Sequence, residues 1–394
     1  MQTDRYARQR LIDWWRQDRL RQACVLVAGA GALGNEVLKN LALLGVGRLL
    51  LIDLDRVEYS NLSRTVLFTE ADVGRPKVEA AAQALARLNP DVLVETIAGD
   101  VFYDLGLGRY RHSQLAIGCL DSLAARSQVG LGCTLAGIPY LDGGMWSLGG
   151  EVRWFAAGDG PCFDCTLTAD DWQRANERRS CSGFRQSDWD EPEHLPTVAT
   201  TAAVIGGLLA QEAAKWLCGY PVTLGRAIVY NGQALTLHRS ELTRNPTCPS
   251  SHTAYQPVIE LPRTAADLTP RQLLAIARAD WERRGDSLPA EDRVAANNWL
   301  LELDRDFLLA MDCPACGRHQ EINRPLGQVP EDEQHCPQCG AARRATVVRS
   351  LDAGSPYADR PLAGLGVPPA EVLAIHTPAG LQLYELSADL PAKA

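Results

Sequence analysis

Residues 24–34 read CVLVAGAGALG, and this stretch decides the fold. An apolar run from Cys24 to Ala28 predicts a buried strand, and the glycines after it predict a tight turn. The following residues, Asn35 to Leu44, have the apolar spacing of a buried helix. A strand, a glycine turn and a helix in this order are typical of the first unit of a nucleotide-binding α/β sheet.

The alternation of strand and helix continues along the first part of the chain. A second apolar run ends at Asp53, and a later one ends at Asp121. Strands and helices that alternate at these lengths predict an α/β fold with a doubly wound, Rossmann-like, mostly parallel sheet. We expect hairpin strands over residues 139–154, a mobile loop over 170–194, a long buried helix over 197–217 and further strands over 226–239.

The composition changes after Cys248. A stretch with three prolines, TAYQPVIELPRTAADLTP, leads into a segment from Thr269 to Met311 that we expect to be helical. Cysteines then cluster, and short apolar runs follow. We therefore expect an α/β domain over residues 1–255, a helical linker region over 256–311, a cysteine-rich unit over 312–342 and a small β-rich tail over 343–394.

Charge and hydropathy exclude some classes of partner. The 394 residues include 48 acidic and 39 basic side chains, a net charge of −9, and no basic run that would neutralise a nucleic-acid backbone. We therefore expect no nucleic-acid partner. There is neither an apolar N-terminal segment nor an 18-residue apolar run, so we expect a cytoplasmic protein without a membrane partner.

The glycine turn is the first candidate binding element. Gly29, Gly31 and Gly34 would let the backbone approach a phosphate, with the N–H groups of the helix aimed at it. Asp53 lies 19 residues past Gly34, where a carboxylate can bind ribose hydroxyls. The pattern suits a dinucleotide about as well as ATP, and tight packing of the turn would also explain the glycines.

Polar residues after Asp53 favour nucleotidyl transfer. The stretch 53–68, DLDRVEYSNLSRTVLF, contains Asn61 and Arg64, and GRPKVEA supplies Lys77. The transition state at an α-phosphate gathers negative charge, which Arg and Lys stabilise best in a closed site. Asp121, at the end of a predicted strand, is suited to hold Mg²⁺ on the phosphates.

Together these motifs resemble the family of ubiquitin-activating-type adenylyltransferases, whose bacterial ThiF/MoeB-type members activate the molybdopterin-synthase and thiamine sulfur-carrier proteins. The resemblance covers roughly residues 4–252. It rests on RYARQ at 5–9, GAGALG at 29–34, DLDRVEYSNLSR at 53–64, VGRPKVEAA at 73–81, GCLDS at 118–122, GPCFDC at 160–165, TAAVIGGLLAQEAAKWL at 201–217 and RNPTC at 244–248.

The resemblance implies ATP- and Mg²⁺-dependent adenylation of the C-terminal glycine of a ubiquitin-like or sulfur-carrier protein, usually on a homodimer. It also implies roles for single residues. Arg8 would reach the ATP phosphates of the neighbouring subunit, Asp53 would bind the ribose, Asn61, Arg64 and Lys77 would bind the phosphates, and Asp121 would bind magnesium.

Cys162 and Cys165 resemble half of the family's structural zinc site, whose other half should be a second Cys-x-x-Cys pair beginning near Cys248. Here Ser251 stands where the fourth thiolate is expected. His252 is the substitute ligand, because imidazole binds Zn²⁺ well. The alternative is a degenerate site that holds no metal.

A second set of cysteines predicts a zinc ribbon in residues 312–342. Cys313 and Cys316 are separated by 19 residues from Cys336 and Cys339, and a glycine follows each pair. Four thiolates without a metal would repel one another, whereas Zn²⁺ can supply the folding energy of such a small unit. A closed four-thiolate site is structural, so we expect this unit to recognise a partner; a redox dithiol is the alternative.

Cys181 is the candidate acyl acceptor. It lies in the polar stretch SCSGFRQSDW, and three arginines nearby favour a thiolate. In family members that go beyond adenylation, a cysteine in this region takes the acyl group as a thioester or persulfide-linked adduct. We expect the same step here, with transfer onward to a sulfur donor or to a conjugating-type enzyme as a further partner; an incidental loop cysteine is the alternative.

Two other functions compete with adenylation. An NAD-dependent oxidoreductase would explain the glycine turn and Asp53 but would leave Asn61, Arg64 and Lys77 without a role. An inactive scaffold subunit of a heterodimeric activating enzyme would be expected to lack the nucleotide residues, and this chain contains all of them.

Overall fold

The computed structural model describes residues 5–156, 158–177, 197–284, 299–377 and 380–388. The chain forms two compact units. The first is built from the N-terminal part, which ends at Ala254. The second holds the C-terminal part from Tyr255 onward and also incorporates residues 103–108.

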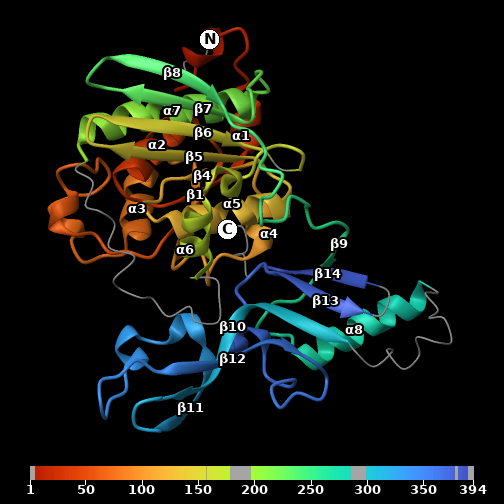
Figure 1. The fold of residues 1–394 in the computed structure, drawn as a ribbon. Coiled ribbons are helices and arrows are strands. Elements are labelled where there is room, and N and C mark those ends of the chain that lie inside the picture. The colour runs from red at the N-terminus through yellow and green to blue at the C-terminus, as the bar shows by residue number, and fades with distance from the viewer. Residues whose placement is uncertain (1–4, 157, 178–196, 285–298, 378–379, 389–394) are drawn as a thin grey trace. The chain divides into compact units, whose positions relative to one another are not determined.

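The first unit is built on an eight-stranded sheet (Figure 1). Its first five strands in spatial order, β3-β2-β1-β4-β5, are parallel, and β6, β7 and β8 continue the sheet as antiparallel strands. The expected doubly wound, mostly parallel sheet is confirmed. The strands are β1 (Cys24–Ala28), β2 (Arg48–Asp53), β3 (Leu93–Ala98), β4 (Leu115–Gly118), β5 (Tyr140–Trp146), β6 (Gly149–Phe155), β7 (Arg226–Asn231) and β8 (Thr236–Glu241).

The core of this unit explains why the opening sequence run is so apolar. Val25 to Ala28 of β1 are fully buried, as expected of a parallel strand covered by helices on both faces. Helices α2 and α7 pack against each other. The helices are α1 (Gln17–Gln22), α2 (Ala32–Leu44), α3 (Lys77–Leu88), α4 (Leu107–Arg111), α5 (Leu123–Ala136), α6 (Ala169–Glu177) and α7 (Ala199–Cys218).

In the described residues of the second unit, a β-sheet is covered by one long helix. The sheet has the order β11-β10-β13-β14-β9, and β12 pairs with β10. Apolar side chains of α8, β10, β13 and β14 form its core. The elements are β9 (Val258–Leu261), α8 (Pro270–Arg283), β10 (Leu300–Asp312), β11 (His319–Pro325), β12 (Arg344–Leu351), β13 (Val372–Thr377) and β14 (Gly380–Leu386).

Two local predictions were wrong. Among the described residues of the segment from Thr269 to Met311, α8 is helical as expected, but the last part is the strand β10. Leu301 and Leu303 alternate with polar residues there, and β10 pairs with β11, β12 and β13. The loop expected over 170–194 begins with helix α6, and its remainder from residue 178 lies outside the described residues.

A buried ion pair holds residues 103–108 in the second unit. Arg305, from β10, pairs with Glu371, and their side chains are only 7% and 1% exposed. The Arg305 guanidinium also donates to the carbonyls of Tyr103 and Leu105, at 3.1 Å each. Glu371 accepts a bond of 3.0 Å from the backbone N–H of Leu107. The pair therefore binds the backbone of a segment that lies about 200 residues earlier in the sequence.

Removing one partner of this pair should destabilise the protein strongly. We expect Arg305→Met to lower the free energy of unfolding by about 3–5 kcal/mol, because Glu371 would remain buried without its countercharge. Urea unfolding followed by circular dichroism measures the change.

Arg271→Met is the matched control for this variant. It removes an arginine that pairs with Asp359 in the same unit, but that pair is exposed to solvent, so we expect little effect. Equal unfolding midpoints for the two variants would contradict the role given to Arg305.

Candidate functional site

The candidate site lies where the order of the parallel strands reverses. β1 pairs with β2 on one side and with β4 on the other, so the chain after β1 and the chain after β4 leave the sheet at the same edge. In open α/β sheets this switch point forms the crevice in which ligands bind. The glycine turn follows β1 here, and Asp121 follows β4.

Packing explains two of the three glycines. Gly29 has φ +98°, and a Cβ atom on it would lie 2.5 Å from the carbonyl oxygen of Cys119. A Cβ atom on Gly34 would lie 2.0 Å from the carbonyl oxygen of Gly29. A Cβ atom on Gly31, in contrast, would meet nothing within 4 Å. Tight packing therefore accounts for Gly29 and Gly34, while the backbone at Gly31 is open to an approaching group.

Asp53, at the end of β2, fixes the shape of this turn. Its Oδ2 accepts a hydrogen bond of 2.6 Å from the Ala30 backbone N–H, and its Oδ1 accepts one of 2.8 Å from Asp55. Desolvation raises the pKa of Asp53, while the nearby Lys77 ammonium and the two N–H bonds oppose the rise. Each carboxylate oxygen retains a lone pair for a further donor, such as a ribose hydroxyl.

Lys77 is the cation whose positive charge opposes the rise in the pKa of Asp53. It begins helix α3 and is 9% exposed. Its Nζ lies 2.7 Å from Oδ2 of Asp55, and its backbone N–H bonds to the Asp55 carbonyl. Sequence reasoning missed Asp55, although its place two residues after Asp53 in DLDRV was a usable signal.

Asn61 and Arg64 lie on and just after a short 3-10 turn (Tyr59–Asn61). Asn61 is buried, and its Oδ1 already accepts a bond of 3.0 Å from the Glu58 N–H. The Arg64 side chain donates to the Ser60 carbonyl at 2.7 Å. Local bonds therefore hold both residues, and Asn61 in particular has a capping role that the sequence did not indicate.

The other predicted residues differ in what surrounds them. Asp121 is exposed and immediately precedes Ser122, which caps helix α5. Arg8 is exposed on the N-terminal segment, beside the buried Tyr6. Cys181 lies outside the described residues.

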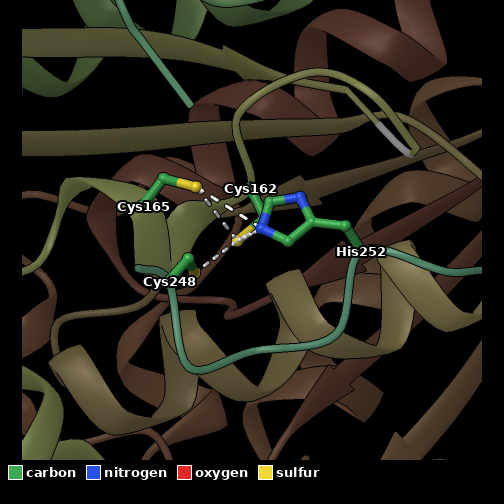
Figure 2. A group of neighbouring side chains, drawn as sticks. All are labelled: Cys162, Cys165, Cys248 and His252. Atoms are coloured by element: carbon green, nitrogen blue, oxygen red, sulfur yellow. Dashed lines mark hydrogen bonds between the residues drawn. The ribbon is translucent and has the colours of Figure 1, made fainter. Parts of the chain in front are cut away.

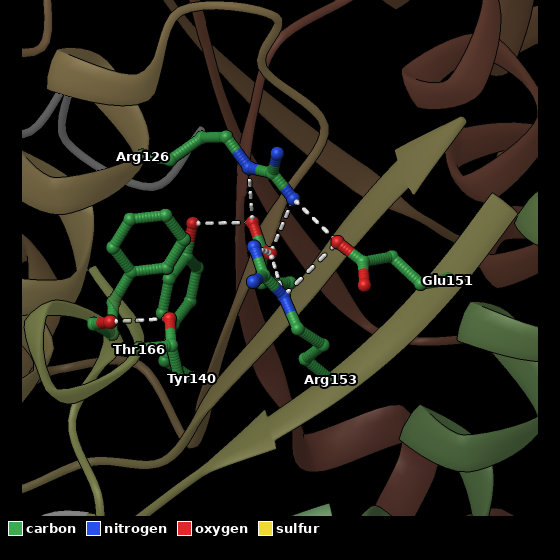
Figure 3. A network of polar contacts seen from close by, with 7 residues as sticks. Arg126, Tyr140, Glu151, Arg153 and Thr166 are labelled. Carbon is green, nitrogen blue, oxygen red and sulfur yellow. Dashed lines mark hydrogen bonds and ion pairs between the residues drawn. The ribbon is translucent and has the colours of Figure 1, made fainter. Parts of the chain in front are cut away.

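A buried charge network anchors helix α5 (Figure 3). Asp142, on β5, is fully buried and accepts bonds from Arg126 of α5 at 2.6 and 3.0 Å, and from Arg153 of β6 at 2.8 and 3.1 Å. Tyr140 donates a further bond of 3.0 Å. Burial alone would raise the pKa of Asp142, but the two guanidinium groups outweigh it and hold that pKa below its ordinary value. Sequence reasoning missed this network, because its members come from three separate elements.

Cys162, Cys165, Cys248 and His252 come together in one cluster (Figure 2). The Cys162 sulfur lies 3.8 Å from that of Cys165 and 3.7 Å from that of Cys248, and His252 Nε2 lies 3.5 Å from two of the sulfurs. Ideal tetrahedral Zn²⁺ would separate two sulfurs by about 3.8 Å and a sulfur from a nitrogen by about 3.6 Å. The donors thus fit zinc, with His252 in the place of the missing fourth thiolate.

Burial, with Cys165 and Cys248 close by, raises the pKa of the Cys162 thiol. At neutral pH the metal-free thiol therefore stays protonated, and a bound metal must displace its proton.

The second cluster contains the four cysteines of the predicted ribbon. Sulfur–sulfur distances are 3.5 Å for Cys313 and Cys339 and 3.6 Å for Cys316 and Cys336. All four donor atoms lie within 4.8 Å of one another. The pairs come from the turn after β10 and the turn before β12, so the C-terminal β-rich unit contains a four-cysteine cluster suited to zinc.

Comparison with known proteins concerns the first unit. The family model described as "ThiF family" matches residues 4–250. The molybdopterin-synthase adenylyltransferase of Escherichia coli is 34% identical over 251 residues, which cover 62% of this chain and 94% of the relative. The SAMP-activating enzyme E1 of Haloferax volcanii is 32% identical, and the match covers 63% of this chain and 88% of the relative.

A solved structure of E. coli MccB with ATP is similar in fold, with a TM-score of 0.51 and 25% identity. The match covers 63% of this chain and 74% of that one.

Among the described helices, none combines the length and apolar character needed to span a bilayer.

We expect the purified protein to contain two zinc ions per chain, because both clusters have the donors and spacing of closed zinc sites. Cys248→Ser should remove one equivalent and Cys313→Ser the other, as measured by atomic absorption. Cys133→Ser serves as the control, since that buried thiol belongs to neither cluster. A wild-type chain without zinc would contradict both assignments.

Proposed function

This chain belongs to the ThiF family, and from that premise we propose that it uses ATP to adenylate the C-terminal carboxylate of a ubiquitin-like or sulfur-carrier protein. The related proteins named above are adenylyltransferases or activating enzymes by name. The observation that carries the proposal is the buried Lys77 beside Asp53 and Asp55, at the edge where the glycine turn is open at Gly31. Hydride transfer would require no such cation, so the family and this site both favour nucleotidyl transfer over an oxidoreductase.

In the proposed reaction, a carboxylate oxygen of the partner's terminal glycine attacks the α-phosphorus of ATP. The bond from that phosphorus to the bridging oxygen of the β-phosphate breaks, pyrophosphate leaves, and an acyl adenylate remains. Asp53 binds the ribose, and Lys77, Arg64 and Asn61 stabilise the charge that develops on the phosphates. Asp121 would hold Mg²⁺, which when bound neutralises part of the phosphate charge.

Lys77 would exchange partners when ATP binds. In the structure its ammonium group pairs with Asp55, whose side chain is 55% exposed. Water can solvate the exposed Asp55 carboxylate once it releases the ammonium group, so a phosphate can take its place beside the buried Lys77 at small cost. Asp55 would thus hold Lys77 in position while the nucleotide site is empty.

Three further assignments complete the proposal. The enzyme acts as a homodimer in which Arg8 reaches the phosphates bound by the other subunit. Residues 1–255 form the adenylation domain, with structural zinc at Cys162, Cys165, Cys248 and His252. Residues 256–394, with the ribbon at 312–342, dock the carrier protein or a conjugating-type enzyme.

Removing the phosphate-binding charges should abolish adenylation without unfolding the chain. We expect Arg64→Ala and Lys77→Ala each to slow ATP–pyrophosphate exchange by about 10²–10³-fold, because each removes a charge-assisted contact to the transition state. The assay uses a panel of purified ubiquitin-like and sulfur-carrier proteins that end in glycine. Arg56→Ala is the control, since Arg56 is an exposed cation of the same segment. Exchange at the wild-type rate in both variants would remove the assignment.

The second step is proposed for Cys181. Its thiolate attacks the carbonyl carbon of the acyl adenylate, AMP leaves, and a thioester forms. We expect Cys181→Ala to keep full pyrophosphate exchange yet form no adduct that a reductant or thiol cleaves, as judged by intact-protein mass spectrometry. Cys218→Ala should retain the adduct, because Cys218 is buried at the end of α7 and burial raises its pKa. An adduct that persists in Cys181→Ala would show that another cysteine is the acceptor.

A further inference from the structure

We propose that Asp164 is the positioning residue of the first metal cluster: its buried carboxylate holds together the two loops that carry the four ligands, without itself binding the metal. Asp164 lies between Cys162 and Cys165, in a 3-10 turn (Phe163–Thr166), and is 3% exposed. It is not one of the four donors that come together in the cluster.

The carboxylate is shared between two serines from distant parts of the sequence. The Ser250 hydroxyl donates to Oδ2, and the Ser127 hydroxyl donates to Oδ1. Ser250 lies midway between Cys248 and His252, and Ser127 is a buried residue of α5. Hydrogen bonds to a charged acceptor are stronger than neutral ones, so Asp164 joins both halves of the ligand set to a helix of the core.

The orientation of the His252 ring depends on the Ser250–Asp164 hydrogen bond more than a zinc-bound histidine usually depends on its loop. A ligating histidine almost always donates its second ring N–H to a carboxylate, a carbonyl or water, and this bond fixes the ring. Within the part of the chain that the structure describes, His252 Nδ1 is buried and has no hydrogen-bond partner. The ring is therefore oriented through its loop, and the bond from Ser250 to Asp164 is the polar tether of that loop, two residues before His252.

Phe163, the residue before Asp164, fixes the same turn through contacts with two arginines. The Phe163 ring is fully buried against the guanidinium groups of Arg153 and Arg126, at 5.0 and 5.6 Å from its centroid. Both arginines bind Asp142, as described above. The turn with Cys162 and Cys165 is thus fixed to the core by Phe163, and Asp164 uses that fixed turn to hold the Cys248–His252 loop.

The test is the rate at which the zinc-loaded full-length protein loses zinc to an excess of a chromogenic chelator. Two release phases are expected, and Cys316→Ser identifies the ribbon phase by removing it. We expect Asp164→Ala and Ser250→Ala to accelerate the other phase by about 10–100-fold, the range by which losing an outer-shell hydrogen bond typically weakens metal binding. The ribbon phase serves as an internal reference and should not change.

Two further variants separate positioning from general destabilisation. Ser250→Thr keeps a hydroxyl and should restore slow release. Ser251→Ala alters a neighbouring hydroxyl that accepts a bond from the nearby Thr253 N–H and should leave release unchanged. If Asp164→Ala does not fold, Ser250→Ala and Asp164→Asn still test the tether.

Release at the wild-type rate in Asp164→Asn and Ser250→Ala would overturn the proposal, as would equal acceleration of both phases. A protein with no zinc in the first cluster would also overturn it. Zinc release tests only the role of Asp164. The adenylation proposal is tested independently, by pyrophosphate exchange.

Discussion

The close approach of the glycine turn to the chain after β4 is the constraint on which the site depends. The carbonyl of Cys119 occupies the space that a side chain at Gly29 would need. This contact brings Asp121, two residues later, to the edge where Asp53 binds the backbone of Ala30. A larger residue at position 29 would separate these two strand ends, and the crevice between them would lose its shape.

The sequence predicted the centre of this arrangement well, because local rules govern it. A continuous apolar run marks a parallel strand buried on both faces, and the residues at its end must then face the ligand crevice. Asp53 and the glycines could be placed in this way, whereas Lys77 was found through the GRPKVEA stretch and the cysteine pairs through their spacing. The misassigned strand β10 shows the limit, since its LLELD pattern suits helix or strand and pairing with β11, β12 and β13 decides between them.

Residues whose role depends on distant partners could not be predicted. Asp142 acquires its role from Arg126 and Arg153, and Asp164 acquires its role from a serine 86 residues further along the chain. In both cases a carboxylate within an apolar stretch was the visible sign, because a buried charge requires partners. The sequence shows that such partners must exist but does not say which residues they are.

The incorporation of residues 103–108 into the second unit affects how a protein of this architecture could arise. A domain appended at Ala254 by simple gene fusion would meet the first unit at one point in the chain. Here the second unit also depends on a backbone segment from the loop after β3, which Arg305 and Glu371 bind. Recombination at the obvious junction would therefore exchange only part of the module. The loop and the C-terminal unit must be inherited together, so we expect substitutions in the two segments to be correlated among related proteins.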